Sequence, residues 1–313
     1  MIAQVAAEVM AETTADGATS LAPNGSAQKD AAHFQYLLHL ADSALVLGQR
    51  NAEWCGHGPV LEEDIAMANI SVDLIGQARM LYQHVALLKG NGATEDTLAY
   101  FRDAPDFRNF TLLELPHSID GTHSNEDGAR DYAVTIVRNF LFSALMVLRW
   151  DALKQSTDAQ LAAVAERSLK ETRYHLRHSR DWLVRLGDGT PESHAKTQAA
   201  WDHLLPYTHE FWTEFAIEDE LVASGIGVAA ARYCSDWQGL VNSAAHEATL
   251  TLPIAIAPTS AAASKPVSTS ASLPTSTPAT ALPQGKNGDH SPHLLPLLAE
   301  MQSLARQHPG ATW

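Results

Sequence analysis

Lys170-Glu-Thr-Arg-Tyr-His-Leu-Arg177 lies in the middle of a long periodic run that ends at Gly187-Asp-Gly189. At about 100° per residue, Glu171, His175 and His178 project within about 60° of one another, at the border of an apolar face. A carboxylate and imidazoles on one side of a helix are the donors that metal sites inside helical bundles use. The stretch therefore predicts a long amphipathic helix, from about 158 to 187, that points a polar line at its neighbours.

Three further runs are regular and long enough to be helices. They cover about 33–50, the stretch from Gly58-Pro59 to Gly90-Asn-Gly92, and the stretch from the loop at 121–125 to about 154. One or two more helices are expected in 192–250, and no convincing run of alternating strand residues occurs. The predicted class is all-α, a four-helix bundle with additional C-terminal helices.

The ligands for a pair of irons are incomplete. Such a bundle needs one Glu from each of two helices and a Glu-x-x-His from each of the other two. Here a tyrosine stands three residues after Glu171, and neither 31–50 nor 127–165 contains any Glu. We predict a vacant position, with no catalytic, cofactor-binding or metal-binding residue in this chain. A single adventitious metal or a degenerate but occupied site stays open, and the vestigial positions that would then hold it are Asp42, Asp73, Asp131, Glu171 and His175.

The second and third helices carry further patterns. Ile65, Val72 and Ile75 belong to one apolar stripe of the second helix, and a second stripe lies nearly opposite, which predicts a helix packed between neighbours. The third helix is apolar nearly all round. Its polar exceptions recur at four-residue steps, at Asp131, Thr135, Asn139 and Ser143. Because this seam lacks Glu and His, it is more typical of a bundle that once held a metal or that buries hydrogen-bonded water.

Charge and cysteine content exclude several functions. The net charge of −15 and the pI near 5.3 argue against a nucleic-acid or anionic-membrane surface. The two cysteines, Cys55 and Cys234, form no Cys-x-x-Cys pair and are expected to be buried free thiols in a reducing cytosol. The N-terminus lacks the basic region of a secretory signal, and the most apolar stretch, 133–150, is interrupted by charged residues. We expect a cytoplasmic protein without a membrane span.

The ends of the chain differ in composition from the middle. Residues 1–30 are rich in Ala, Thr and Gly, and 257–290 are dominated by Pro, Ser, Thr and Ala. Both are expected to be disordered, the first as an extension and the second as a tether. Residues 31–256 are predicted as the helical domain, and 291–313 resume an amphipathic pattern typical of a short docking helix.

Several other matches to site motifs are interpreted as structural. Asp30 and His33 have the right spacing, but Asp30 is expected to be the N-cap of the first helix, and Glu114-Leu-Pro-His117 contains a proline. His246-Glu-Ala-Thr-Leu250 lacks the second His of a zinc protease motif. Glu53-Trp-Cys-Gly-His-Gly-Pro59 holds a cysteine and a histidine, yet a turn packed by its tryptophan is the preferred interpretation.

Several ordered blocks of this chain closely resemble the C subunits of ring-1,2-phenylacetyl-CoA epoxidases, which are bacterial multicomponent monooxygenases. The resemblance covers about 33–250 and the last twenty or so residues, and the long tether and the N-terminal extension depart from it. The matching blocks are 42–50, 53–62, 68–79, 170–177, 246–250 and 298–302.

The resemblance implies a ferritin-like fold and a structural, non-catalytic role. In such complexes a related A subunit holds the di-iron centre and binds the thioester, and a small B subunit bridges. A reductase with FAD and a 2Fe-2S cluster delivers electrons from NADPH, and the reaction epoxidises the aromatic ring of phenylacetyl-CoA with O₂. Two other hypotheses are a di-iron oxygenase in its own right, and an unrelated helical carrier or storage bundle.

Overall fold

The computed structural model describes residues 25–120, 130–213, 215, 217–252 and 282–311. The chain divides into two compact units, Met1–Ala31 and Ala32–Trp313. The predicted extension up to residue 24, the loop at 121–125 and most of the predicted tether lie outside the described residues. The second unit carries the sites discussed below.

The described residues form helices and contain no strand, so the predicted all-α class is confirmed. The α-helices are α2 (Gly25–Ala52), α3 (Leu61–Lys89), α4 (Glu95–Tyr100), α5 (Tyr132–Leu153), α6 (Ala159–Gly187), α7 (Pro191–Leu204), α8 (Glu218–Ala223), α9 (Cys234–Glu247) and α10 (Leu294–Gln307). Short 3₁₀ turns connect them at Ala104–Asp106, Thr111–Leu113, Leu205–Trp212, Ala230–Tyr233 and Gly285–Asn287.

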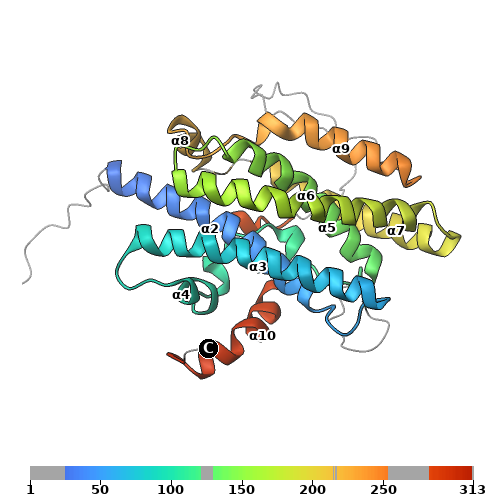
Figure 1. The fold of residues 1–313 in the computed structure, drawn as a ribbon, viewed down its shortest axis with the longest axis horizontal. Coiled ribbons are helices and arrows are strands. Elements are labelled where there is room, and N and C mark those ends of the chain that lie inside the picture. The colour runs from blue at the N-terminus through green and yellow to red at the C-terminus, as the bar shows by residue number, and fades with distance from the viewer. Residues whose placement is uncertain (1–24, 121–129, 214, 216, 253–281, 312–313) are drawn as a thin grey trace, which may run out of the picture. The chain divides into compact units, whose positions relative to one another are not determined.

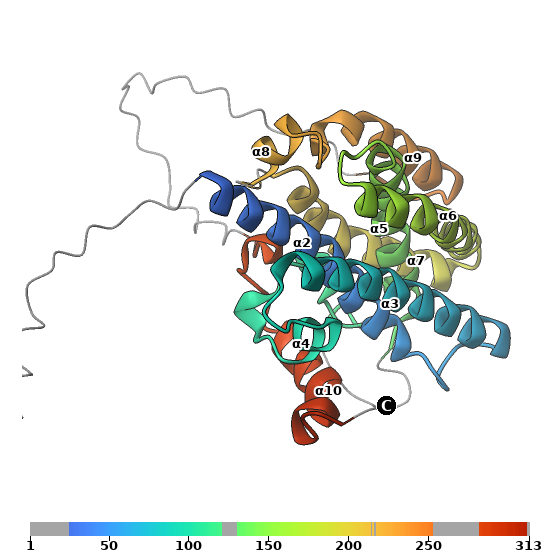
Figure 2. The ribbon, with the colours of Figure 1, turned by 60° about the vertical axis from the view of Figure 1, so that its left-hand side comes forward.

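Four long helices, α2, α3, α5 and α6, form the bundle. Both α3 and α5 pack along α6, and the two ribbon views show α3 beside α6 (Figures 1 and 2). At the contact of α2 with α3, a Cβ added to Gly48 would lie 3.1 Å from Cγ1 of Ile75, so the glycine allows the close approach. At the contact of α2 with α5, the amides of Asn51 and Asn139 exchange two hydrogen bonds of 2.9 Å.

Helix α2 begins earlier than the sequence pattern predicts. It starts at Gly25 rather than near His33, so residues 25–30 are helical and their assignment to a disordered extension is wrong. Asp30 therefore lies inside the helix and is not its N-cap. The apolar period that guided the prediction starts only where the helix begins to bury side chains, at Ala32 and Tyr36.

Helix α5 is the core helix. It is long and apolar enough to cross a membrane by length and composition alone, but 89% of its most apolar window is buried inside the protein. It packs against α6, α7 and α9. The buried Arg138 and Asn139 on this helix hydrogen-bond within the protein, to the carbonyl of Pro116 and to Asn51. The burial of α5 in the core thus explains why its composition is so apolar.

Only one apolar stripe of α3 is buried. Met67, Ile70 and Leu74 are in the core, as the pattern predicts. The other stripe faces solvent, so the prediction that α3 is packed on two sides is wrong for this chain by itself. The exposed residues, called the α3 stripe below, are Leu61, Ile65, Val72 and Ile75.

The C-terminal segment packs on the bundle from residue 282 onward, so the predicted tether is too long. Pro283 and Gly285 hydrogen-bond to Thr111, and the side chain of Lys286 is buried. Helix α10 then contacts α4, on the opposite side of the bundle from α9 (Figures 1 and 2). Composition did not reveal this packing, because the partner Thr111 lies far from residues 283–285 in the sequence.

Candidate functional site

A row of three polar pairs joins α3 to α6. Nε2 of His175 donates to Asp73 at 3.0 Å, and Nε2 of Gln77 donates to Glu171 at 3.1 Å. Further along, Nε2 of His178 donates to Glu63 at 2.8 Å, and the Tyr132 hydroxyl donates to the same oxygen at 2.7 Å. As the residue numbers increase along α3, the numbers of their partners on α6 decrease, so the two helices are antiparallel. We call these contacts the α3–α6 ladder.

The ladder brings together three of the five vestigial positions, Asp73, Glu171 and His175, but as partners in separate pairs. Each carboxylate accepts a hydrogen bond from its own partner across the interface. Two irons instead require carboxylates and imidazoles that converge on common points. Among the residues that the structure describes, these positions form no group of three potential ligands within 4.8 Å of one another. The donor set therefore does not fit a di-iron centre.

Asp42 does not face the ladder. Its side chain is completely buried and forms an ion pair with Arg102. It also accepts hydrogen bonds from the Tyr82 hydroxyl at 2.5 Å and from the backbone N–H of Arg108 at 2.8 Å. Burial and the Asp42 charge together hold the pKa of Tyr82 well above its usual value. As a fallback ligand Asp42 is wrong, because it neutralises the Arg102 guanidinium and does not meet the other fallback positions.

Asp131 is also wrong as a fallback ligand. It precedes α5, and its Oδ1 accepts the backbone N–H of Ala133 at 2.8 Å, so it is the N-cap of that helix. The four-residue spacing assigned Asp131 to the polar seam on the assumption that the helix already includes this residue.

Two of the remaining positions of the α5 seam are satisfied by protein side chains. Thr135 accepts the indole N–H of Trp54 at 2.9 Å and donates to Nδ1 of His117 at 2.6 Å, while Asn139 pairs with Asn51. The hydroxyl of Ser143 is buried and has no hydrogen-bond partner among the described residues. Where a di-iron bundle would present glutamates, these three positions present hydroxyl and amide groups. Trp54 is buried, as its turn predicts, but Cys55 beside it is exposed and Cys234 is half-buried, so the expectation of two buried thiols is wrong.

His117 is the centre of this buried network. Its Nε2 donates to the carbonyl of Arg50 at 2.8 Å, and its Nδ1 accepts from Trp54 and Thr135. An indole N–H can only donate, so a proton on Nδ1 would face another donor. Burial lowers the pKa of His117 to about 4, and the charge on Arg138 acts in the same direction, against the attraction of Glu53.

We expect His117 to make the protein less stable in acid. The native imidazole stays neutral, whereas that of the unfolded chain takes up a proton near its ordinary pKa of 6.5, so this contribution is lost as the pH falls from 6.5 towards 4. Between pH 7 and 5 the free energy of unfolding of the native chain should fall by about 2 kcal/mol relative to that of His117→Gln. Denaturant unfolding at the two pH values measures this difference.

Comparison with a variant is necessary because Glu210 acts with the opposite sign. Burial raises the pKa of Glu210 to about 7, so its carboxyl group favours the folded state as the pH falls from 7 to 4.5. The control is His57→Gln, which removes an exposed imidazole and should leave the pH dependence unchanged. Equal pH dependence of the native chain and His117→Gln would show that folding does not change the pKa of His117.

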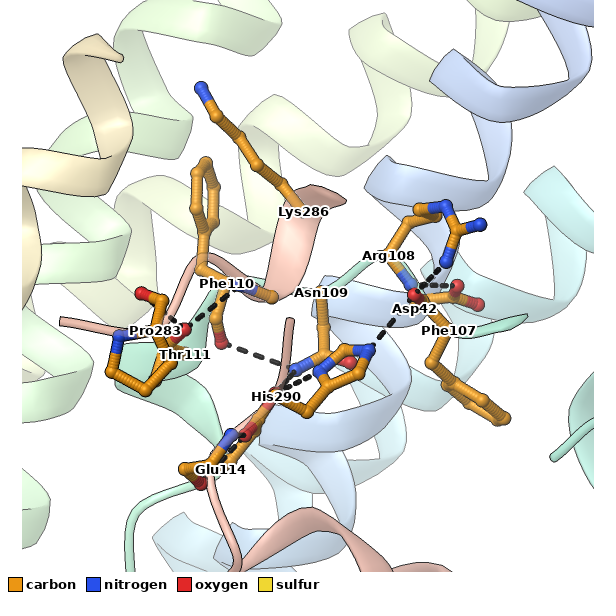
Figure 3. Close-up of polar contacts among 12 residues, drawn as sticks. Asp42, Phe107, Arg108, Asn109, Phe110, Thr111, Glu114, Pro283, Lys286 and His290 are labelled. Carbon is orange, nitrogen blue, oxygen red and sulfur yellow. Dashed lines mark hydrogen bonds and ion pairs between the residues drawn. The ribbon is translucent and has the colours of Figure 1, made fainter. Parts of the chain in front are cut away.

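Sequence reasoning missed a second buried carboxylate, Glu114. Its side chain is completely buried and accepts hydrogen bonds from Asn109 at 2.9 Å and from the backbone and hydroxyl of Ser291 at 2.8 and 2.7 Å. His290 also pairs with it, and Figure 3 shows both side chains beside Asn109. A signal existed, because Glu114 stands within the apolar run Leu112-Leu-Glu-Leu115, but nothing local identified its partners.

Glu210 fixes the same C-terminal segment a few residues earlier. Its two oxygens accept the backbone N–H groups of Thr111 at 2.7 Å and of Lys286 at 2.8 Å. Thr111 in turn donates to the carbonyl of Pro283, as Figure 3 shows. Glu114 and Glu210 are thus the anchors of residues 283–291 and are structural rather than catalytic in their contacts.

One pocket lies away from the ladder. It has a volume of about 810 Å³ and lies between α3, α4 and α10. Two of its charged residues, Arg79 and Glu95, pair with each other at 3.4 Å. No residue of the α3–α6 ladder lines it, so the ladder and the pocket are separate features.

The fold is that of a ferritin-like helical bundle, in which the polar residues between α3 and α6 pair with one another. The chain belongs to the phenylacetic acid catabolic protein family, whose model matches residues 21–265. It is 40% identical over 278 residues to the C subunit of 1,2-phenylacetyl-CoA epoxidase from Escherichia coli strain K12, an alignment that covers 89% of this chain and 98% of that protein. The hypothesis of an unrelated carrier bundle is therefore wrong.

Proposed function

We propose that this chain is a non-catalytic structural subunit of a multicomponent phenylacetyl-CoA 1,2-epoxidase that acts in aerobic phenylacetate degradation. Its similarity to the C subunit of such an epoxidase supports the assignment to this kind of complex. The observation that carries the non-catalytic role is the α3–α6 ladder. There Asp73, Glu171 and His175 are used in separate pairs, and the one carboxylate of the α5 seam, that of Asp131, caps the helix.

The remaining components of the proposed complex supply the chemistry. A related A subunit would bind this chain tightly and hold two irons and the thioester, and a small B subunit would bridge. A reductase with FAD and a 2Fe-2S cluster would pass electrons from NADPH. This subunit would hold none of these cofactors, and we place the complex in the cytoplasm.

The α3 stripe is the surface that we assign to the catalytic subunit. Leu61 is 71% exposed and Val72 is 68% exposed, on the same face of α3 as Ile65 and Ile75. A continuous exposed apolar face on a helix is typical of a protein interface, and obligate interfaces are the more hydrophobic ones. With the α3 stripe covered by the catalytic subunit, both apolar stripes of α3 would be buried in the complex.

We expect reconstituted epoxidation to require this chain. The A-type subunit, the bridging subunit, reductase, NADPH and phenylacetyl-CoA should give full turnover only when this chain is added, and this chain without the A-type subunit should give none. Product formation and NADPH consumption measure the result. Full epoxidation without this chain, or turnover by this chain alone, would contradict the proposal.

The interface is tested by a charge on the α3 stripe. Val72→Asp should leave the isolated chain folded and weaken co-elution with the A-type subunit by at least tenfold, or about 1.4 kcal/mol. Leu87→Asp is the matched control, because Leu87 is also on α3 and 81% exposed but is outside the stripe. If Val72→Asp co-elutes with the A-type subunit as the native chain does, the interface lies on another surface of this chain. The proposed structural role would not be affected.

The alternative function, a di-iron oxygenase with a degenerate but occupied site, is favoured by one observation, the meeting of Asp73, Glu171 and His175 at one interface. We expect the purified chain to hold no stoichiometric iron after aerobic reconstitution, as measured by elemental analysis. His175→Ala should then change stability, not colour. About two irons per chain, lost in His175→Ala, would establish the alternative.

A further inference from the structure

Two histidines and one aspartate meet where the early part of α2, the last turns of α3 and the start of α6 come together. Nε2 of His33 and Nε2 of His84 lie 2.8 Å and 2.6 Å from the same oxygen, Oδ2 of Asp158. Among the described residues, these are the only three His, Cys, Asp or Glu side chains whose ligand atoms all lie within 4.8 Å of one another. None of them belongs to the α3–α6 ladder.

The carboxylate is held in place from the opposite side. Oδ1 of Asp158 accepts the backbone N–H groups of Gln160 at 3.0 Å and Leu161 at 3.1 Å, so Asp158 is the N-cap of α6. Its own N–H donates to the hydroxyl of Ser156, which donates to the carbonyl of Ile226 at 2.8 Å. The cap thus uses one carboxylate oxygen and leaves the other facing the two imidazoles.

The surroundings suit a bound ion better than an ordinary surface ion pair. The side chains of His33, His84 and Asp158 are only 16%, 9% and 8% exposed, so all three groups are largely withdrawn from water. The two rings meet edge to face, at 76° with centroids 6.0 Å apart, and reach the oxygen from different directions. His33 keeps the largest exposed fraction of the three, so the group is not closed off from solvent.

We propose that His33, His84 and Asp158 bind one zinc-type divalent cation through Nε2, Nε2 and Oδ2, with water as the fourth ligand. Two imidazoles and a carboxylate are ligands that Zn²⁺ prefers, and three protein ligands plus water make a four-coordinate site. With metal–ligand bonds of about 2.0–2.1 Å, tetrahedral ligand atoms lie about 3.3 Å apart, so each imidazole nitrogen moves away from Oδ2 by roughly half an ångström. Each neutral histidine frees Nε2 by carrying its proton on Nδ1.

Such an ion would join three helices that are distant in sequence. His33 and Asp158 are 125 residues apart, and His84 and Asp158 are 74 apart. A cation held in the folded chain only would stabilise the bundle in proportion to its affinity. The inference does not depend on the proposed function, because it concerns neither iron nor the ladder.

The test uses the full chain, stripped with a chelator and then supplied with Zn²⁺ alone. We expect one zinc per chain to be retained through gel filtration, and a higher thermal midpoint than that of the stripped chain. His33→Ala with His84→Ala should lose the zinc and the shift in midpoint. His175→Ala is the matched control: it removes the other Asp–His pair, Asp73–His175, and should keep both.

Two results would overturn the site: no zinc retained by the native chain, or one zinc retained by the double variant. If the double variant does not fold, His84→Gln replaces it, because a glutamine amide can still donate a hydrogen bond to Asp158 but is a poor zinc ligand. Zinc affinity should then fall at least tenfold in titration calorimetry. An unchanged affinity in His84→Gln would equally overturn the proposal.

Discussion

A chain that ends at residue 281 loses at least about 5 kcal/mol of its free energy of unfolding. The truncation exposes the surfaces that bury Leu294, Leu297 and Leu298, and full burial of a leucine contributes about 1.5–3 kcal/mol. It also leaves Glu114 in the interior without the donors of His290 and Ser291. A buried carboxylate that loses its partners is among the most destabilising changes known. Denaturant unfolding against the full chain measures the loss.

A point variant keeps this prediction testable if the truncated chain does not fold. Glu114→Gln turns an amide N–H₂ toward groups that are themselves donors, and should cost about 2–4 kcal/mol and make the C-terminal segment more sensitive to protease. Glu300→Gln, on the exposed side of α10, is the control and should cost less than about 0.5 kcal/mol. Equal stability of the two variants would mean that the segment is not anchored through Glu114.

The second large effect is expected for Asp42→Asn, which should cost about 3–5 kcal/mol. The change leaves the Arg102 guanidinium beside a neutral amide, in a place where Asp42 is completely buried. The amide also cannot accept from Tyr82, Arg102 and the Arg108 N–H together as the carboxylate does. Urea unfolding at neutral pH measures the loss, with thermal unfolding as a second observable.

Asp103→Asn is the matched control for Asp42→Asn. Asp103 also pairs with an arginine, Arg306, at 3.0 Å, but its side chain is 76% exposed. Exposed ion pairs contribute at most about 1 kcal/mol. Similar losses in the two variants would show that water reaches Asp42 in solution, and would remove the physical reason for calling it a structural residue.

The helices were predictable where one face is apolar over many turns. The bounds of α3 and α6 follow the pattern closely, because Gly90 and Gly187-Asp-Gly189 stop them and Asp158 caps α6. The start of α2 and the order of residues 282–290 were not predictable. The first turns of α2 precede its apolar period, and the partners of residues 282–290, such as Glu114 and Glu210, lie far away in the sequence.

The candidate sites were predictable only in part. Periodicity placed Glu171 and His175 on one face of α6, and Asp73 does meet His175, whereas Glu171 pairs with Gln77. It failed for Asp42 and Asp131, because a polar residue near a bundle can face a loop or cap a helix as easily as it can face the centre. The cluster of His33, His84 and Asp158 has no local pattern at all, since its members come from three helices and meet only when the bundle is closed.

Helix α5 also determines when the growing chain can fold. It is buried on nearly all sides, and the helices that cover it, α6, α7 and α9, come later in the sequence. A nascent chain that has been synthesised only to residue 153 therefore presents its most apolar helix to water, to chaperones and to other nascent chains. At a translation rate of about 5–20 residues per second, the 94 residues to the end of α9 leave this helix uncovered for roughly 5–20 seconds. Slow translation or heat shock during this interval should reduce the soluble yield more than the stability of the finished protein would suggest.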